Sequence, residues 1–117
     1  MKDKNNTSIT WEDFEKVELH IGTIIEVMDF PEAIKPAYKL IIDFGKEIGI
    51  KKSSAQITGL YTKDSLLNKQ VIAVTNFPPK QIGNFMSEVL VTGFKQQNGE
   101  VILSVPDKPC ENGLRLM

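Results

Sequence analysis

The chain has 117 residues, of which 41% are hydrophobic and 25% charged, and its net charge is −1. This composition is that of one soluble globular domain, large enough to bury a core of its own. The longest apolar runs are only a few residues long, which excludes a membrane-spanning helix and predicts no membrane insertion.

Cysteine content and charge distribution bear on location and partners. Cys110 is the only cysteine, which excludes an internal disulfide, and residues 1–8 lack the apolar core of a signal peptide, so we expect a cytoplasmic protein.

Residues 1–32 carry eight acids against three lysines, whereas residues 33–95 carry nine lysines against four acids. The middle of the chain is therefore where a polyanion would bind, although lysines that only solvate strand edges are an equally open explanation.

The N-terminal residues predict a tail followed by a short helical turn. Residues 1–9 are polar, and we expect them to be flexible ahead of a single domain at residues 10–117. Thr10 has the side chain of a helix N-cap, and Trp11 and Phe14 lie on one side of the turn that follows. We expect these two aromatic rings to pack on the rest of the domain or on a partner subunit.

The next part of the chain predicts three strands. β-Branched residues indicate a long strand over Val17–Met28, with Gly22 at a bulge or a sharp bend. A second strand is predicted at Tyr38–Phe44 and a third at Glu47–Ser53, joined by a turn at Gly45-Lys46.

A helical turn and two further strands follow. Thr62 caps the predicted turn, and Asn68 ends it. A fourth strand is predicted at Gln70–Thr75 and a fifth at Val89–Phe94, with a hairpin turn at Asn98-Gly99. The order predicts an all-β fold, a five-stranded oligonucleotide/oligosaccharide-binding (OB) barrel with a short helix between strands three and four and extensions at both termini. A generic small β-barrel is the competing interpretation, and the position of the helix favours the OB barrel.

The segment Phe77–Ser87, between the fourth and fifth strands, is the most informative part of the chain. Pro78 and Pro79 exclude it from a central strand, because neither has an N–H group, and Gly83 frees the backbone at one point. Its apolar residues argue against disorder. The segment therefore predicts a rigid, partly apolar binding loop on a β scaffold.

Catalytic chemistry has little support in the sequence. His20 is the only histidine and Cys110 the only cysteine, so neither a nucleophile–base pair nor a zinc site of usual ligand spacing can be assembled from them. Neither a Walker sequence nor a Gly-x-Gly-x-x-Gly fingerprint is present. We expect no enzymatic activity, no catalytic residue, no cofactor, no metal and no small-molecule substrate.

The predicted fold indicates where a macromolecule would bind. OB barrels bind ligands on the face of strands two and three, between the loop after strand one and the loop after strand four, here Phe30–Pro36 and Phe77–Ser87. Lysines would meet phosphates, aromatic rings would stack on bases, and neutral polar groups would donate and accept hydrogen bonds. The candidate ligand-binding residues, for tRNA or for a peptide, are Lys35, Lys51, Lys52, Ser53, Gln56, Asn76, Phe77, Lys80, Phe85, Ser87 and Glu88.

Structural roles compete with these assignments. Core packing is the alternative for each phenylalanine, and turn or helix capping is the alternative for the neutral polar residues. Glu88 would repel phosphate, so it would accept bonds from base amines or hold the loop in shape. With Arg115 as the only arginine, we expect weak and salt-sensitive RNA binding. The same surface suits an extended peptide, which apolar pockets and an exposed strand edge would hold.

Five segments resemble, in order and spacing, the structure-specific tRNA-binding domain family and, within it, the CsaA group of export-related chaperones. They are Asp13-Phe14-Glu15-Lys16-Val17, Glu18-Leu19-His20-Ile21-Gly22, Ile50-Lys51-Lys52-Ser53-Ser54-Ala55-Gln56-Ile57, Leu67-Asn68-Lys69-Gln70-Val71, and Asn76-Phe77-Pro78-Pro79 through Gly83 to Ser87-Glu88. The resemblance implies a homodimer, with contacts in the terminal extensions Trp11–Lys16 and Val101–Leu116. It also implies tRNA binding and, for the CsaA group, binding of unfolded or precursor polypeptides during export.

Two departures from the family pattern concern anion binding. His20 stands where the family commonly has arginine, which makes any anion contact there pH-dependent. Gln81 follows Lys80, where relatives often carry two basic residues. The sequence thus predicts a non-catalytic, dimeric binding protein and leaves open whether polypeptide or tRNA is its ligand. The alternative is a tRNA-binding assembly subunit that docks onto a tRNA-using enzyme.

Overall fold

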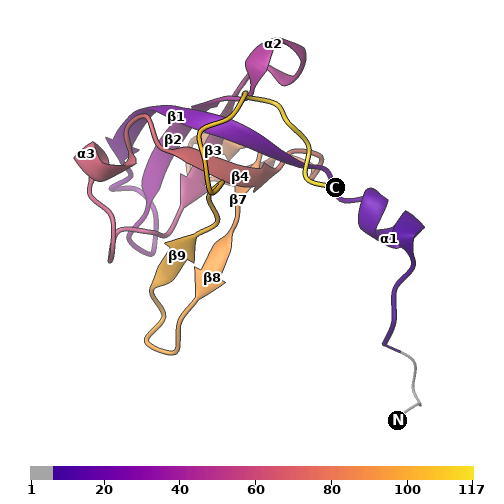
Figure 1. Ribbon diagram of the computed structural model, residues 1–117. Coiled ribbons are helices and arrows are strands. Elements are labelled where there is room, and N and C mark those ends of the chain that lie inside the picture. Colours follow the sequence, from indigo (N-terminus) through magenta and orange to yellow (C-terminus); the bar gives the residue numbers. More distant parts are fainter. Residues whose placement is uncertain (1–6) are drawn as a thin grey trace.

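The computed structural model describes residues 7–117, so residues 1–6 of the predicted tail lie outside the described part of the chain. Five antiparallel strands form one sheet in the order β3-β2-β1-β4-β7, which curls into a nearly closed barrel (Figure 1). The all-β OB-type prediction is confirmed, with the short helix α3 between β3 and β4. The elements are α1 Trp11–Glu15, β1 Leu19–Asp29, β2 Tyr38–Asp43, α2 Gly45–Ile48, β3 Ile50–Ala55, α3 Lys63–Leu66, β4 Gln70–Val74, β5 Lys80–Ile82, β6 Phe85–Ser87, β7 Leu90–Val91, β8 Gly93–Lys95 and β9 Val101–Leu103.

The barrel interior is filled by apolar side chains from alternate strand positions. Its largest fully buried members are Ile24, Leu40, Ile42, Phe44 and Val71, with Leu66 of α3 closing one end. Removing this surface from water is the main term that stabilises the fold.

Gly22 is part of this packing, and its predicted role is corrected. The β-bulge falls between Ile24 and Glu26, whereas Gly22 pairs in register with Val71. A Cβ atom on Gly22 would lie 2.6 Å from Cγ2 of Ile42 and 2.7 Å from the ring of Phe44. The glycine therefore allows β1 to pass close over the buried side chains of Ile42 and Phe44, and the bulge lies two to three residues further along the strand.

The predicted third strand, Glu47–Ser53, begins too early. Gly45 and Gly49 have φ angles of 89° and 87°, and the N–H of Gly49 donates to the carbonyl of Gly45 at 2.7 Å. These left-handed residues enclose the helical turn α2, which takes up the positions assigned to the start of the strand. β3 consequently runs from Ile50 to Ala55.

The helical turn α3 forms as its sequence predicts. The hydroxyl of Thr62 accepts from the N–H of Ser65 at 3.1 Å, and Asn68 has a φ of 70° where the turn ends. Lys63 donates to the carboxylate of Asp29 at 2.9 Å, and this bond raises the pKa of Lys63. The pair ties α3 to the end of β1.

The Pro-Pro segment is a β-hairpin rather than an irregular loop. After Pro79, strands β5 and β6 pair through a two-residue connection in which Gly83 has a φ of 58°. A positive φ at the first central residue is typical of hairpin turns that favour glycine there. Phe85 of the hairpin meets Phe30 of the β1–β2 loop, ring centroids 5.5 Å apart, in a second small apolar cluster. The segment is therefore outside the barrel sheet, as the prolines predict, but it is ordered by strand pairing.

The predicted fifth strand, Val89–Phe94, is divided in two. β7 pairs with β4, whereas β8 pairs with β9 in a separate hairpin that projects from the barrel (Figure 1). The chain leaves the barrel at Thr92, whose N–H donates to Ile72 and whose carbonyl accepts from Ser104. The predicted turn at Asn98-Gly99 is confirmed, and Gly99 has a φ of 90°.

The C-terminal tail lies beside the first part of β1, where β2 no longer pairs. Ile21 exchanges backbone hydrogen bonds with Gly113 and Leu114, and the N–H of Leu116 donates to Leu19. Helix α1 stands clear of the barrel near this tail (Figure 1), and none of its residues is buried. Within residues 7–117, no helix combines the length and apolar character needed to cross a bilayer.

We expect Gly22→Ala to lower the free energy of unfolding by about 1–3 kcal/mol, because the added methyl group overpacks the core beside Ile42 and Phe44. Urea titration followed by far-ultraviolet circular dichroism measures the loss. Glu26→Ala, on the exposed side of the same strand, is the control and should change stability by less than about 0.5 kcal/mol. Equal stability of wild type and Gly22→Ala would contradict the close-approach role.

Candidate functional site

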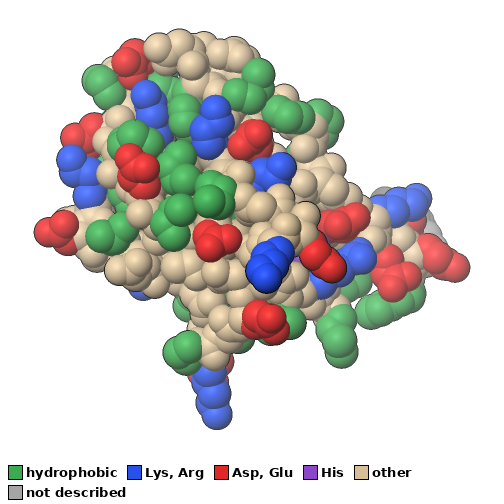
Figure 2. All heavy atoms as spheres, turned by 90° about the horizontal axis from the view of Figure 1, so that it is seen from above, with side chains coloured by type: hydrophobic (Ala, Val, Ile, Leu, Met, Phe, Trp, Pro, Cys, Tyr) green, Lys and Arg blue, Asp and Glu red, His purple; other side chains and the backbone are tan. Residues whose placement is uncertain are grey.

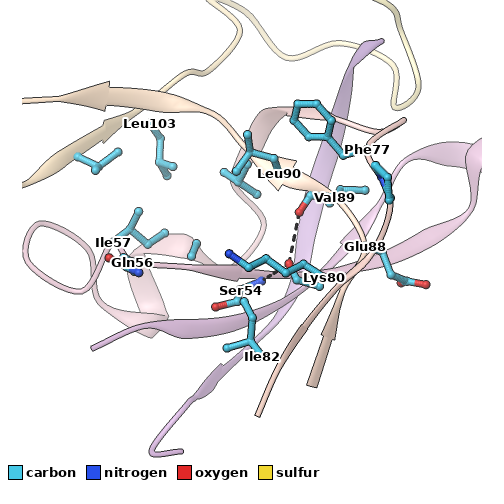
Figure 3. Close-up of a pocket in the computed structure, with 15 residues that line it drawn as sticks. Ser54, Gln56, Ile57, Phe77, Lys80, Ile82, Glu88, Val89, Leu90 and Leu103 are labelled. Atoms are coloured by element: carbon cyan, nitrogen blue, oxygen red, sulfur yellow. Dashed lines mark hydrogen bonds between the residues drawn. The ribbon is translucent and has the colours of Figure 1, made fainter. Parts of the chain in front are cut away.

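A groove of about 580 Å³ lies at one side of the barrel. It lies where the end of β3 faces the β5–β6 hairpin, β7 and β9 (Figure 3). We call it the seam groove. Its lining residues are Ser54, Ala55, Gln56, Ile57, Phe77, Pro78, Lys80, Ile82, Ser87, Glu88, Val89, Leu90, Val91, Val101 and Leu103.

The seam groove exists because the barrel closes at one point and opens beyond it. The carbonyl of Lys52 accepts from the N–H groups of Glu88 and Val89, at 2.8 and 3.3 Å. Past Lys52, a side chain takes the place of a paired strand, because the N–H of Ser54 donates to Oγ of Ser87 at 3.0 Å. Among the described residues, β3 and β7 form no ladder. β3 and β7 therefore separate, and the space between them is the groove.

Glu88 reinforces the closed part. Its Oε1 atom accepts from the N–H of Lys52 at 3.0 Å, so the carboxylate holds the hairpin against β3 and points away from the groove in Figure 3. Of the two roles open at the sequence level, the structure supports the one in which Glu88 holds the loop in shape. Ser87 has the same kind of contact with Ser54.

The groove has an apolar floor and a partly exposed apolar rim. Ile57, Val89 and Leu103 are buried at its base, whereas Leu90 and Phe77 keep 49% and 50% of their surface exposed. Exposed apolar surface that lines a concavity is typical of a site for an apolar ligand or partner. Phe77 is thus the one predicted platform that remains accessible to a ligand.

A single cation reaches into this apolar space. Of the described residues that line the groove, Lys80 is the one that carries a positive charge, and Figure 3 shows its side chain extending across the groove toward Gln56. Gln56 is itself exposed and lines the wall formed by the end of β3. Five of the predicted residues, namely Gln56, Phe77, Lys80, Ser87 and Glu88, therefore meet around one groove.

A second feature, which we call the basic face, lies on the outer side of β2 and β3. The ammonium of Lys39 lies 4.9 Å from the ring centroid of Phe30 and 5.5 Å from that of Phe85, and the ammonium of Lys52 lies 5.5 Å from that of Phe85. Such cation–π contacts hold the two charges over the small apolar cluster. Glu32, with Oε1 3.9 Å from the Lys39 ammonium, offsets part of the charge.

Lys39 is a basic-face residue that sequence reasoning missed. Its position could be read from strand alternation, because buried Leu40 and Ile42 assign Lys39 to the outer side of β2. The pairing of Lys39 with Ser54, and of Ile41 with Lys52, then brings both lysines to one face.

Lys51 and Lys52 do not share a face. They are consecutive strand residues, so their Cβ atoms point to opposite sides of β3, and Lys51 pairs with inward-facing Ile42. Lys35 is exposed in the β1–β2 loop and does not line the groove.

Three other predicted residues have structural surroundings. Ser53 is fully buried in the barrel, and Phe85 keeps only 7% of its surface exposed, so neither presents its side chain to a ligand in this structure. The amide of Asn76 accepts from the N–H of Glu18 and donates to the carbonyl of Lys16, which fixes the α1–β1 connection. Phe30 is also buried, so the structure supports core packing, the alternative to stacking, for both rings.

Groups capable of chemistry are dispersed. Nδ1 of His20 lies 2.9 Å from the carbonyl oxygen of Gly113. The N–H of Cys110 donates to the side-chain oxygen of Gln70 at 3.0 Å. Neither His20 nor Cys110 lines the seam groove. Among residues 7–117, no three His, Cys, Asp or Glu side chains gather in a metal-binding arrangement.

Comparisons with known proteins match this architecture. The sequence profile of the family described as "Putative tRNA binding domain" matches residues 19–115. The crystal structure of chaperone CsaA from Bacillus anthracis superposes with a TM-score of 0.89 at 44% identity, over 95% of this chain and 100% of that one. The CsaA chaperone protein from Picrophilus torridus gives 0.88 at 57% identity, over 94% and 100%. The chain belongs to the tRNA-binding domain family and, within it, to the CsaA group.

The family also includes segments of much larger proteins. Methionine–tRNA ligases of Thermococcus onnurineus and Pyrococcus horikoshii are 34% and 35% identical to this chain over 109 and 116 residues. The match covers 92% and 98% of this chain but only 14% and 15% of the ligases. The chain thus spans a small part of the length of these relatives.

We expect Glu88→Ala to destabilise the protein by about 1–3 kcal/mol, because it leaves the Lys52 N–H without its acceptor at a part-buried site. Urea unfolding measures the change, and hydrogen exchange of the Lys52 amide reports it locally. Glu88→Gln keeps an acceptor oxygen and should retain most of the stability. Equal losses in both variants would show that charge, rather than the hydrogen bond, accounts for the effect.

Proposed function

We propose that this CsaA-group protein is a non-catalytic, chaperone-type binding protein that holds extended segments of unfolded polypeptide in the seam groove. The observation that carries the proposal is the groove itself, an apolar channel beside an open strand edge. The two CsaA structures reported above, at 44% and 57% identity, are named chaperones. We place the protein in the cytoplasm, where unfolded and precursor polypeptides are made.

The apolar rim supports this function over catalysis. Leu90 and Phe77 remain about half exposed beside buried Val89 and Leu103, so an apolar side chain of a client would gain further burial there. Gln56 and Lys80 are the polar groups at the wall and across the opening. The arrangement favours retention of a bound chain and offers no nucleophile with an adjacent base.

A second candidate function, tRNA binding at the basic face, is favoured by Lys39 and Lys52. Their ammonium groups are fixed over Phe30 and Phe85, so little side-chain entropy is lost when they meet phosphates. The family description and the methionine–tRNA ligase relatives support the same ligand. In this alternative the protein is an assembly subunit that docks onto a tRNA-using enzyme.

We further propose that the protein is a homodimer that pairs through α1 and the C-terminal tail. Trp11 is 61% exposed with its ring 5.5 Å from Phe14, and Leu114, Leu116 and Met117 are 48%, 42% and 95% exposed. Figure 2 shows hydrophobic side chains projecting at one end of the molecule. A second copy would bury these exposed apolar side chains.

Leu90→Ser should weaken binding of a reduced and alkylated, permanently unfolded protein by about tenfold, because it removes an apolar contact from the groove rim. Fluorescence anisotropy with the labelled unfolded protein measures the affinity. The matched control is Leu67→Ser at the end of α3, since Leu67 is 46% exposed but does not line the groove. Similar losses in both variants would contradict the seam groove as the polypeptide site.

Lys39→Gln combined with Lys52→Gln should weaken tRNA binding and make the plot of log affinity against log salt shallower by about 1 to 1.5, since each phosphate contact contributes about 0.7. Anisotropy with labelled tRNA at several salt concentrations measures the slope. Lys46→Gln combined with Lys108→Gln removes the same charge elsewhere on the surface. An unchanged slope in the first pair would exclude the basic face as the tRNA site.

Trp11→Ser should convert the dimer to a monomer at micromolar concentration, because it removes the largest exposed apolar side chain of α1. Light scattering coupled to size exclusion measures the mass. Leu67→Ser is again the control and should stay dimeric. A wild-type protein that elutes as a monomer would contradict the assembly proposal without affecting the groove.

A further inference from the structure

We propose that the seam groove binds polypeptide by strand addition: a client segment pairs in parallel with the outer edge of β3, one residue of it lying opposite Ala55. This inference rests on the proposed polypeptide-binding function and specifies how that site recognises its ligand. It follows from which backbone groups of β3 face the groove.

The register of β2 and β3 decides the direction of these groups. In an antiparallel pair, residues alternate between those that bond to the neighbouring strand and those whose N–H and C=O point away from it. Both backbone groups of Lys52 bond across the seam, to Glu88 and Val89, so Lys52 is of the second kind. Ser54, two residues on, has the same direction, and its N–H indeed donates to Ser87.

The next groups along this edge are free to pair with a client. The N–H of Gln56 points to the groove side by the same alternation, and within residues 7–117 it has no hydrogen-bond partner. The carbonyl of Ser54 accepts only a 3.3 Å bond from the neighbouring Ser53 hydroxyl, which leaves a lone pair for a second donor. One acceptor and one donor therefore flank Ala55 on a wall of the groove.

These two groups match one residue of a parallel strand. In a parallel ladder, the N–H of a residue donates to the carbonyl of the residue that precedes its partner. Its carbonyl accepts from the N–H of the residue that follows its partner. A client residue opposite Ala55 would donate to Ser54 and accept from Gln56. In an antiparallel pair, the client residue opposite Ser54 would need both the carbonyl and the N–H of Ser54. The Ser54 N–H already donates to Oγ of Ser87 at 3.0 Å.

The side-chain environment defines the chemistry of the client. A residue opposite Ala55 points to the same side as Ala55, toward the apolar floor that includes Val89 and Leu103. Its two neighbours in the strand point outward. Because Lys80 crosses the groove and Glu88 is turned away, a carboxylate at an outward position is complementary in charge. The occupant is thus an extended segment with apolar residues at alternate positions and an acidic residue between them.

Peptide N-methylation tests this inference on the intact wild-type protein. The probe is a short fluorescein-labelled peptide of alternating valine and serine, with one central serine replaced by glutamate. One version is N-methylated on the valine amides and another on the remaining amides. In parallel addition the valine N–H donates to Ser54, so methylation of valine should weaken binding by about tenfold or more, and methylation of the other amides by less than about threefold.

The control outcomes separate the two levels of the proposal. Equal losses from both methylation patterns, no loss from either, or a loss only from the non-valine pattern would overturn parallel strand addition. If the unmethylated peptide binds and Leu90→Ser abolishes that binding, the polypeptide site stands whatever the methylation pattern shows. Failure of the unmethylated peptide to bind at all would instead overturn the proposed function.

Discussion

The structure depends on how the barrel is closed between β3 and the segment that precedes β7. Two backbone bonds to the carbonyl of Lys52, and the side-chain acceptors of Glu88 and Ser87, join these edges over a short distance. Buried polar backbone groups must be paired, so this closure satisfies β3 where no complete strand is available. Beyond Ser54 the same edge has no neighbour, and the seam groove follows from that incomplete pairing.

The β5–β6 hairpin links the two candidate binding surfaces. On one side it contributes Ile82, Lys80 and the preceding Phe77 to the groove, and on the other its Phe85 supports the lysines of the basic face. Phe85 itself is fixed by Phe30 from the β1–β2 loop, so the two loops flanking the usual OB ligand face pack against each other. A single apolar contact thereby positions a groove suited to polypeptide and a cationic surface suited to phosphate.

Much of this fold could be predicted from the sequence because its signals are local. The cap at Thr62, the turn at Asn98-Gly99 and the β-branched strands all act through neighbours in the chain. The helical turn α2 was missed because Gly45 and Gly49 are compatible with a simple turn until their positive φ angles are known. The bulge was assigned to Gly22 because the close approach of that residue to Ile42 is a tertiary contact, which the local sequence does not contain.

The site was predicted less completely, for the same physical reason. Residue type identified Phe77, Lys80 and Gln56 as site residues. Phe85 has the aromatic side chain that stacking requires, but it is buried against Phe30, a residue distant in sequence. Lys39 was overlooked because its importance comes from strand pairing and from two rings that only the fold brings beneath it. The hydrogen bonds that the side chains of Ser87 and Glu88 accept from N–H groups of β3 likewise depend on the closure of the barrel.

The most direct test of this account is a map of backbone amide chemical shifts in the isotope-labelled protein as a permanently unfolded polypeptide is added. The account predicts the largest changes at Gln56, Ile57, Leu90 and Val91, on the two edges that diverge beyond the seam. Changes confined to α1 and the C-terminal tail, with the amides of β3 and β7 unaffected, would contradict it.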